Sequence, residues 1–94
     1  VIKIIFTPGH TPGHQSVLIN LPKTGHMLLT GDACYTGDHW CDRCLPGLVA
    51  SASDAADSVA KLRKIARETN AKVVWGHDPV TWLDWNKAPM FYYD

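Results

Sequence analysis

Two histidines stand four residues apart in a stretch that cannot form a helix. The segment TPGHTPGHQS, residues 7–16, places His10 and His14 each directly after a Pro-Gly pair. Proline and glycine break helices, so a loop must present these imidazoles. Further along, Asp32 ends the run LLTGD and His77 ends the run VVWGH. Imidazole nitrogens and carboxylates are ligands of zinc and similar transition metals, and one carboxylate can bridge two ions.

Short apolar segments must position these side chains. The segments are rich in β-branched or aliphatic residues and stop at Pro, Gly or Asp, which is typical of strands. We expect four strands, at residues 1–6, 14–21, 27–30 and 71–75. The Pro-Lys-Thr-Gly turn at residues 22–25 indicates that the second and third strands form a hairpin.

One helix is predicted between the third and fourth strands. Apolar residues recur at helical spacing over residues 53–69, with acidic residues early and basic residues late, as the helix dipole favours. Ser51 and Asp54 resemble a capping box that would start the helix slightly earlier. Asn70 suits the C-terminal cap.

Two segments lie outside this pattern. Residues 33–50 are predicted to form one long loop, and loops of that length are usually functional. The tail, residues 80–94, is rich in aromatic side chains, whose apolar weight predicts packing rather than disorder. Trp82 and Trp85 are expected to pack, and the tail and loop together are candidates for the walls of an apolar pocket.

Strand directions bring the candidate ligands to one edge of the sheet. The hairpin makes the third strand run parallel to the first, and a strand-helix-strand crossover makes the fourth parallel to the third. His10, Asp32 and His77 each follow the C-terminal end of one of these three strands, where ligands gather in such sheets. Taken singly, each residue has a plainer interpretation as part of a loop or turn. Together they can converge on one point.

The other histidines leave one alternative open. The same topology places His14 at this edge, so strand direction does not choose between His10 and His14. Gly9 leaves the backbone beside His10 room to approach an ion, whereas the sheet fixes the direction of His14, which weakly favours His10. His26 and His39 lie in predicted turn or loop positions and are expected to be exposed and not to bind metal.

Composition limits the partners and the compartment. Nine basic residues balance nine acidic ones, which argues against a nucleic-acid surface and favours a small neutral substrate or a protein partner. No apolar run approaches the roughly 20 residues that span a bilayer, so no membrane role is expected. Three cysteines do not make a disulfide framework, and we expect reduced thiols in a cytoplasmic protein. Cys41 and Cys44 form an isolated CxxC, expected to be structural or incidental.

The order and spacing of three motifs resemble the C-terminal half of a metallo-β-lactamase-fold hydrolase. The motifs are TPGHTPGHQS, LLTGDACYT and VVWGHD. Within that superfamily the sequence is most similar to the N-acyl-homoserine lactone lactonases, because Gln15-Ser16 and the run from Asp32 to Thr36 favour this branch. The match extends from about Ile4 to His77.

The resemblance implies an α/β (α+β) fold, half of an αββα sandwich, with a mixed sheet of about four strands and one main helix. It implies two zinc or similar divalent ions, one bound by His10, the other by His77, and both bridged by Asp32, with His14 outside the ligand set. The implied activity is hydrolytic opening of N-acyl-homoserine lactones (quorum quenching) by metal-generated hydroxide. Tyr35 would hydrogen-bond the lactone carbonyl and stabilise the oxyanion, so Tyr35 and Asp32 are the candidate catalytic residues. From the residues alone, Tyr35 would be a packing side chain.

One expected motif does not occur in these residues. The superfamily's first metal-binding motif, HxHxDH, appears nowhere in the 94 residues. The resemblance therefore implies that residues 1–94 are the C-terminal half of the domain and that the N-terminal half, with four further ligands, is the partner they need. We expect these residues alone to hold at most a weak metal site, to be inactive and to be poorly stable. The oligomeric state is open, a homodimer included.

Two other hypotheses remain. One is another hydrolase of the same superfamily, a glyoxalase II-like thioesterase or a β-lactamase-like enzyme, against which the tyrosine after Asp32 argues. The other is a non-catalytic binding or structural module, which the missing HxHxDH favours. The metal content of the protein separates an enzyme from such a module.

Overall fold

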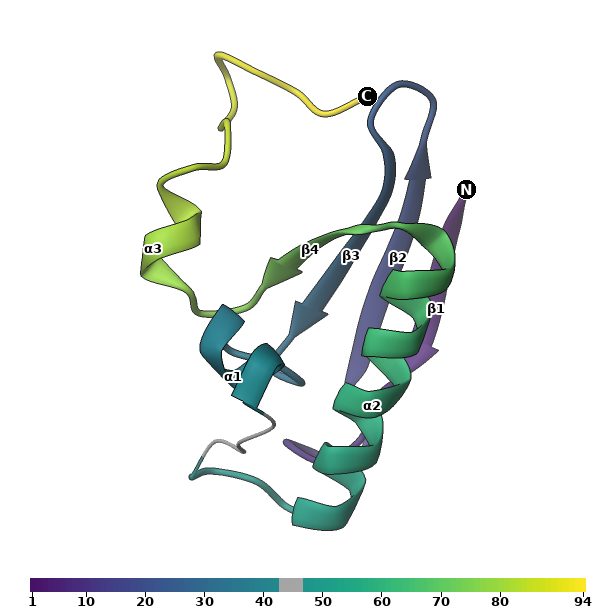
Figure 1. Ribbon diagram of the computed structural model, residues 1–94, viewed down its shortest axis with the longest axis vertical. Coiled ribbons are helices and arrows are strands. Elements are labelled where there is room, and N and C mark those ends of the chain that lie inside the picture. The colour runs from purple at the N-terminus through teal and green to yellow at the C-terminus, as the bar shows by residue number, and fades with distance from the viewer. Residues whose placement is uncertain (43–46) are drawn as a thin grey trace.

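Four strands form one mixed sheet in the computed structural model, which describes residues 1–42 and 47–94 (Figure 1). The strands are β1 (Ile2–Phe6), β2 (Gln15–Leu21), β3 (Gly25–Gly31) and β4 (Lys72–Trp75). They lie side by side in sequence order; β2 is antiparallel to both β1 and β3, and β4 is parallel to β3. The predicted mixed sheet of an α+β fold is confirmed, with boundaries shifted by only one or two residues.

One long helix, α2 (Ala52–Thr69), covers one face of this sheet (Figure 1). Both predicted caps are present: the Ser51 hydroxyl accepts a hydrogen bond from the Asp54 N–H, and Asn70 adopts the left-handed conformation with φ 52°. The apolar stripe of α2 packs on the inner face of β2 and β3. The buried centre of this core consists of Leu18, Leu28, Ala33 and Leu62.

The opposite face of the sheet is also apolar, but none of the helices within residues 1–42 and 47–94 covers it (Figure 1). Ile2, Ile4 and Phe6 alternate along β1 and are 66%, 58% and 55% exposed. Since alternate residues of a strand share a face, these side chains continue across β2, where Ile4 lies opposite Val17 and Ile2 opposite Ile19. The structure therefore has one helix layer and one sheet layer, and its second sheet face has the composition of an interface.

The prediction of one continuous loop over residues 33–50 is wrong. A short helix, α1 (Gly37–Asp42), forms within it. The Thr36 hydroxyl accepts a hydrogen bond from the His39 N–H at 3.1 Å, which is the geometry of a helix N-cap. The Trp40 side chain packs against the core, and its carbonyl accepts a hydrogen bond from Arg63 of α2 at 2.7 Å. Tertiary contacts thus stabilise a helix too short to show apolar periodicity.

The CxxC motif is only partly described. Cys41, its first cysteine, is exposed on α1, whereas Cys44 lies outside the described residues. The expected structural or incidental role of Cys41 and Cys44 therefore stays a prediction. The third cysteine, Cys34, is buried. Among the described residues, no helix has the length and apolar character to cross a membrane.

The aromatic tail begins with the short helix α3 (Pro79–Trp82) and then returns to the β2–β3 turn (Figure 1). There the Asp94 carbonyl accepts hydrogen bonds from the backbone N–H groups of Lys23 and Thr24. The predicted packing of the tail against the domain is therefore only partly present. Backbone hydrogen bonds attach the C-terminal end of the tail to the β2–β3 turn, and its aromatic rings pack mainly on one another. Trp85 packs on Tyr93 at a centroid distance of 5.5 Å, whereas Trp82 stays 58% exposed.

Candidate metal centre

His10, Asp32 and His77 meet at one edge of the sheet. His10 lies in the loop after β1, Asp32 directly follows β3, and His77 lies two residues beyond β4. Figure 1 shows β1 and β3 pointing toward this same lower edge, next to α1. The Asp32 carboxylate lies 3.4 Å from His10 Nε2 and 2.6 Å from His77 Nε2. The convergence expected from strand direction is therefore present.

The Asp32 carboxylate lies between the two imidazoles, and each of its oxygens faces a different ring. Oδ2 faces His10 Nε2, and Oδ1 forms a direct hydrogen bond with His77 Nε2. Exposure rises across the group, from 23% for the His10 side chain through 39% for Asp32 to 60% for His77. Among residues 1–42 and 47–94, no group of three or more His, Cys, Asp or Glu side chains is arranged so that it could hold a metal ion. The edge thus gathers two imidazoles around one carboxylate.

His10 is held in the form that a metal ligand needs. Its Nδ1 lies 3.0 Å from the Leu48 carbonyl, to which it donates. In the neutral ring this leaves the lone pair on Nε2, the atom that faces Asp32. The preceding residue, Gly9, has φ +142°, and its carbonyl accepts hydrogen bonds from the N–H groups of Ala50 and Ser51. The start of α2 thereby fixes the loop that carries His10.

Both ring nitrogens of His14 form hydrogen bonds with backbone groups. Its Nε2 accepts a hydrogen bond from the Asp32 N–H at 3.0 Å, and its Nδ1 lies 3.1 Å from the Thr7 carbonyl. Gly31 permits this approach, because a Cβ at that residue would lie 3.0 Å from His14 Nε2. His14 therefore orients Asp32 from behind, while His10 faces the carboxylate. This geometry distinguishes the two histidines that sequence alone could not.

A network of buried hydroxyl groups beneath this edge was not predicted from the sequence. The Thr7 hydroxyl lies 2.9 Å from His14 Nδ1 and 2.8 Å from the Ser16 hydroxyl, which in turn donates to the Thr30 carbonyl. Thr7 and Thr30 have no exposed surface, and Ser16 is 1% exposed. Threonine and serine near strand ends are too common to mark such a network, so no sequence signal would have identified it.

Tyr35 lies between the two candidate ligands. Its ring packs edge-on against His77 at a centroid distance of 4.6 Å, and its hydroxyl lies 3.5 Å from His10 Nδ1, the outer limit for a hydrogen bond. Its backbone carbonyl accepts the His77 N–H at 2.9 Å. The phenol is thus at the edge where the resemblance places a donor to the substrate carbonyl.

The expectation that His39 and His26 are exposed is wrong. His39 is only 5% exposed because α1 turns it inward, where its Nδ1 accepts the Tyr35 N–H at 3.3 Å. Burial, with the nearby Arg63 charge as a second cause, lowers the pKa of His39 below its ordinary value. His26 is half-buried at the start of β3, the end of that strand away from Asp32. Neither histidine contacts the Asp32 carboxylate.

Asp78, the residue after His77, ties the site to both short helices. Its Oδ2 accepts the N–H of Gly37, at the start of α1, and its Oδ1 accepts the N–H groups of Val80 and Thr81 in α3. These backbone bonds, led by the one from Gly37, lower the pKa of Asp78. This role of Asp78 was not predicted from the sequence, although an Asp before a Pro is a helix-start signal.

A cavity of about 330 Å³ lies beside His77. Its aromatic walls come from the end of β4 and from the tail, which partly meets the expectation of an apolar pocket. The aromatic lining residues are Trp75, Trp82 and Trp85.

The chemical types of these side chains suit a divalent transition metal. Two imidazole Nε2 atoms and both oxygens of one carboxylate point into the same edge, and the Leu48 carbonyl fixes the tautomer of one imidazole. Nitrogen and carboxylate donors of this kind suit zinc and its neighbours better than calcium or magnesium. The metal roles of His10, Asp32 and His77 stay predictions that this arrangement supports.

The chain resembles known lactonases in sequence. Over 88 residues it is 56% identical to the N-acyl homoserine lactonase AttM of Azorhizobium caulinodans, a match that covers 94% of this chain and 34% of that protein. It is 38% identical over 77 residues to an N-acyl homoserine lactonase of Bacillus cereus, covering 82% of this chain and 30% of that protein. The chain therefore spans about a third of the length of the curated relatives it matches.

Solved structures and a family model agree with this similarity. An N-acyl homoserine lactone hydrolase, solved with the product N-hexanoyl-L-homoserine bound at its catalytic metal centre, aligns with a TM-score of 0.87 and 31% identity. That match covers 94% of this chain and 35% of the other. Residues 1–77 match the family model of the metallo-beta-lactamase superfamily. The chain belongs to the metallo-beta-lactamase superfamily.

Proposed function

We propose that residues 1–94 form the C-terminal part of a metal-dependent hydrolase that opens the lactone ring of N-acyl homoserine lactones. The observation that carries the proposal is the Asp32 carboxylate, which lies between His10 and His77 and next to the Tyr35 phenol. The 56% identity to an N-acyl homoserine lactonase supports this choice of substrate. In this proposal the full-length protein, not these residues alone, is the active enzyme.

The proposed cofactor is a pair of zinc or similar divalent ions. His10 would hold one ion and His77 the other, and Asp32 would help to hold both. When bound, such ions lower the pKa of a shared water toward neutrality and polarise the lactone carbonyl. The relative solved with a product at its catalytic metal centre supports a metal at this edge.

Neighbouring residues orient the Asp32 carboxylate and the Tyr35 hydroxyl for this reaction. His14 fixes the backbone of Asp32 through its Nε2 and so sets the direction of the bridging carboxylate. The Tyr35 hydroxyl is free to leave its long 3.5 Å contact with His10 and donate to the oxygen of a bound carbonyl. A donor aimed at the developing oxyanion stabilises the transition state more than the ground state.

The open face of the sheet gives the rest of the domain a place to pack. Ile2, Ile4 and Phe6 expose an apolar strip that a second sheet would cover in an αββα sandwich. We propose that the N-terminal half packs there and contributes the remaining metal ligands.

Metal content and lactone opening of the full-length protein test the proposal. We expect about two divalent ions per chain and turnover of N-acyl homoserine lactones. Asp32→Asn removes one carboxylate oxygen, so it should lower metal content and reduce lactone opening by at least about 100-fold. His26→Asn, a change at the far end of β3, is the matched control and should leave both unchanged.

The same assay separates the alternative functions. A fully metallated protein that opens no lactone but cleaves thioesters or β-lactams would contradict the lactonase assignment and favour another hydrolase. A folded protein without metal would instead favour a non-catalytic module.

A further inference from the structure

His39 forms a hydrogen bond that no sequence motif predicts. It lies in α1, is 5% exposed, and accepts the Tyr35 backbone N–H through Nδ1 at 3.3 Å. Its own backbone N–H is fixed by the Thr36 hydroxyl at 3.1 Å. Because Nδ1 accepts, the neutral ring carries its proton on Nε2, which is buried and has no hydrogen-bond partner among the described residues. The ring is therefore set in one tautomer and one orientation.

The His39 bond completes a clamp on the main chain of Tyr35. On one side the Tyr35 N–H is bound to His39, and on the other its carbonyl accepts the His77 N–H at 2.9 Å. The Tyr35 ring then packs on His77 and reaches His10. A shift of the Tyr35 main chain would therefore move the phenol relative to both candidate ligands.

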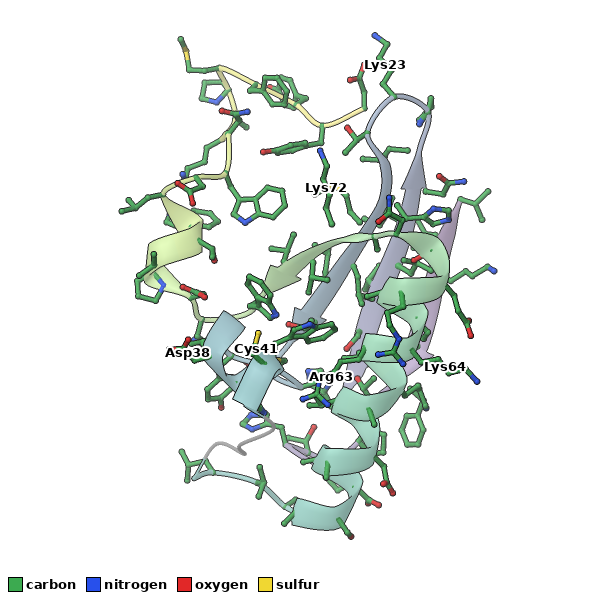
Figure 2. The ribbon with its side chains drawn as sticks, viewed as in Figure 1. Lys23, Asp38, Cys41, Arg63, Lys64 and Lys72 are labelled. Carbon is green, nitrogen blue, oxygen red and sulfur yellow. The ribbon has the colours of Figure 1, made fainter. Side chains whose placement is uncertain are left out.

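The surroundings of His39 favour its neutral form. Arg63 of α2 extends toward α1, while its neighbour Lys64 points to the other side of the helix (Figure 2). The Arg63 Nε donates to the Trp40 carbonyl at 2.7 Å, which holds the guanidinium close to His39. A second positive charge on the buried imidazole would be repelled, so His39 keeps the unprotonated Nδ1 that the Tyr35 N–H needs.

We propose that His39 is a positioning residue that acts through Tyr35: by accepting the Tyr35 N–H it holds the phenol over the edge formed by His10, Asp32 and His77. This inference rests on the proposed lactonase function for its kinetic consequence. The hydrogen bond itself is measurable without any activity.

The test uses three substitutions of His39 in the full-length, metal-loaded protein. Asn places an acceptor oxygen where Nδ1 was, Gln places one where Nε2 was, and Leu provides none. Misplacement of a catalytic group by up to about 1 Å costs as much as about 100-fold, so His39→Leu and His39→Gln should lower kcat by about 10- to 100-fold with little change in KM. His39→Asn should stay within about threefold of the wild type. Metal content and melting temperature select folded variants.

A double-mutant cycle with Tyr35→Phe identifies the route of the effect. If His39 acts through the phenol, His39→Leu should cost less than about twofold once the hydroxyl is absent. A loss in the Tyr35→Phe background as large as in the wild type would overturn the proposal, because His39 would then act independently of Tyr35.

Hydrogen exchange of the Tyr35 amide separates this inference from the function itself. Protection should fall in His39→Leu and persist in His39→Asn. Equal protection in wild type and His39→Leu would overturn the positioning role whatever the enzyme hydrolyses. Absence of lactone opening by the wild type, with His39-dependent protection retained, would reject the proposed function and leave the clamp established.

Discussion

Replacing Gly9 with alanine tests how His10, the first histidine of the TPGHTPGHQS segment, is held at the edge of the sheet. Gly9 precedes His10 and lies against the start of α2, and its carbonyl accepts hydrogen bonds from the N–H groups of Ala50 and Ser51, just before that helix. A Cβ at this residue would lie 2.5 Å from Ala55 N and 2.6 Å from Ala55 Cβ, and the backbone has φ +142°. The substitution therefore conflicts with both the space and the backbone conformation.

The expected cost follows from these two conflicts. A non-glycine residue in such a conformation costs about 1–3 kcal/mol. Forcing an extra carbon into a closely packed contact costs about another 1–3 kcal/mol. Since the Ala55 atoms in contact include rigid helix backbone, relaxation must shift the loop, and with it His10. We expect Gly9→Ala to lower the free energy of unfolding by about 2–6 kcal/mol and to weaken metal binding.

Gly13 provides a matched control within the same TPGHTPGHQS segment. It precedes His14 as Gly9 precedes His10, but a Cβ there would meet no atom within 4 Å. Gly13→Ala should change stability by no more than about 1 kcal/mol, in the stabilising direction if anything. Urea unfolding and metal titration of the two full-length variants measure the difference. Equal stability and equal metal affinity in both variants would refute the argument that Gly9 fixes His10 against α2.

Three further outcomes follow from the core, a cap and a titrating group. Leu62 has no exposed surface, so Leu62→Ala should lower the free energy of unfolding in urea by about 2–5 kcal/mol. Leu48 is 79% exposed, so Leu48→Ala should lower it by less than about 0.5 kcal/mol. Similar losses in the two variants would contradict the assignment of Leu62 to the core. Ser51→Ala removes the N-cap of α2 and should cost about 1 kcal/mol, with Ser51→Asp as the variant that restores stability. The folded-state pKa of His39 is lowered from 6.5 by burial and Arg63, so its contribution to stability is present above about pH 6.5 and is lost as the pH falls toward the folded value. Unfolding measured from pH 7.5 to 5 should therefore lose less stability in His39→Leu than in the wild type, and parallel pH profiles would contradict this.

The sheet was predictable because each of its signals is local. The β-branched run before Thr7 and the turn ending at Gly25 mark strand ends independently of tertiary contacts. Once the number of reversals is known, strand direction follows, and so does the edge at which His10, Asp32 and His77 lie. The capped helix after Ser51 was predictable for the same reason, since its apolar period extends over five turns.

The helix α1 was not predictable because nothing local in its six residues specifies it. It depends on the Thr36 cap, on burial of the His39 ring and on the hydrogen bond from Arg63, which lies more than twenty residues away. The clamp on Tyr35 depends on α1 and was therefore also invisible in the sequence. Asp78 is an intermediate case, since its cap of α3 was visible in the sequence but its bond to Gly37 required the fold.

His10 and His14, the two histidines of the TPGHTPGHQS segment, show which features of a site a sequence motif does not determine. His10 and His14 occupy equivalent positions after Pro-Gly, and both reach the same edge. They differ in what the ring nitrogens meet: His14 has a backbone partner for each, whereas His10 has one and turns the other toward Asp32. A nitrogen committed to a backbone N–H has no lone pair left for an ion. The two rings therefore differ through backbone groups contributed by residues as distant as Leu48, and this difference supports the prediction that His10, rather than His14, binds metal.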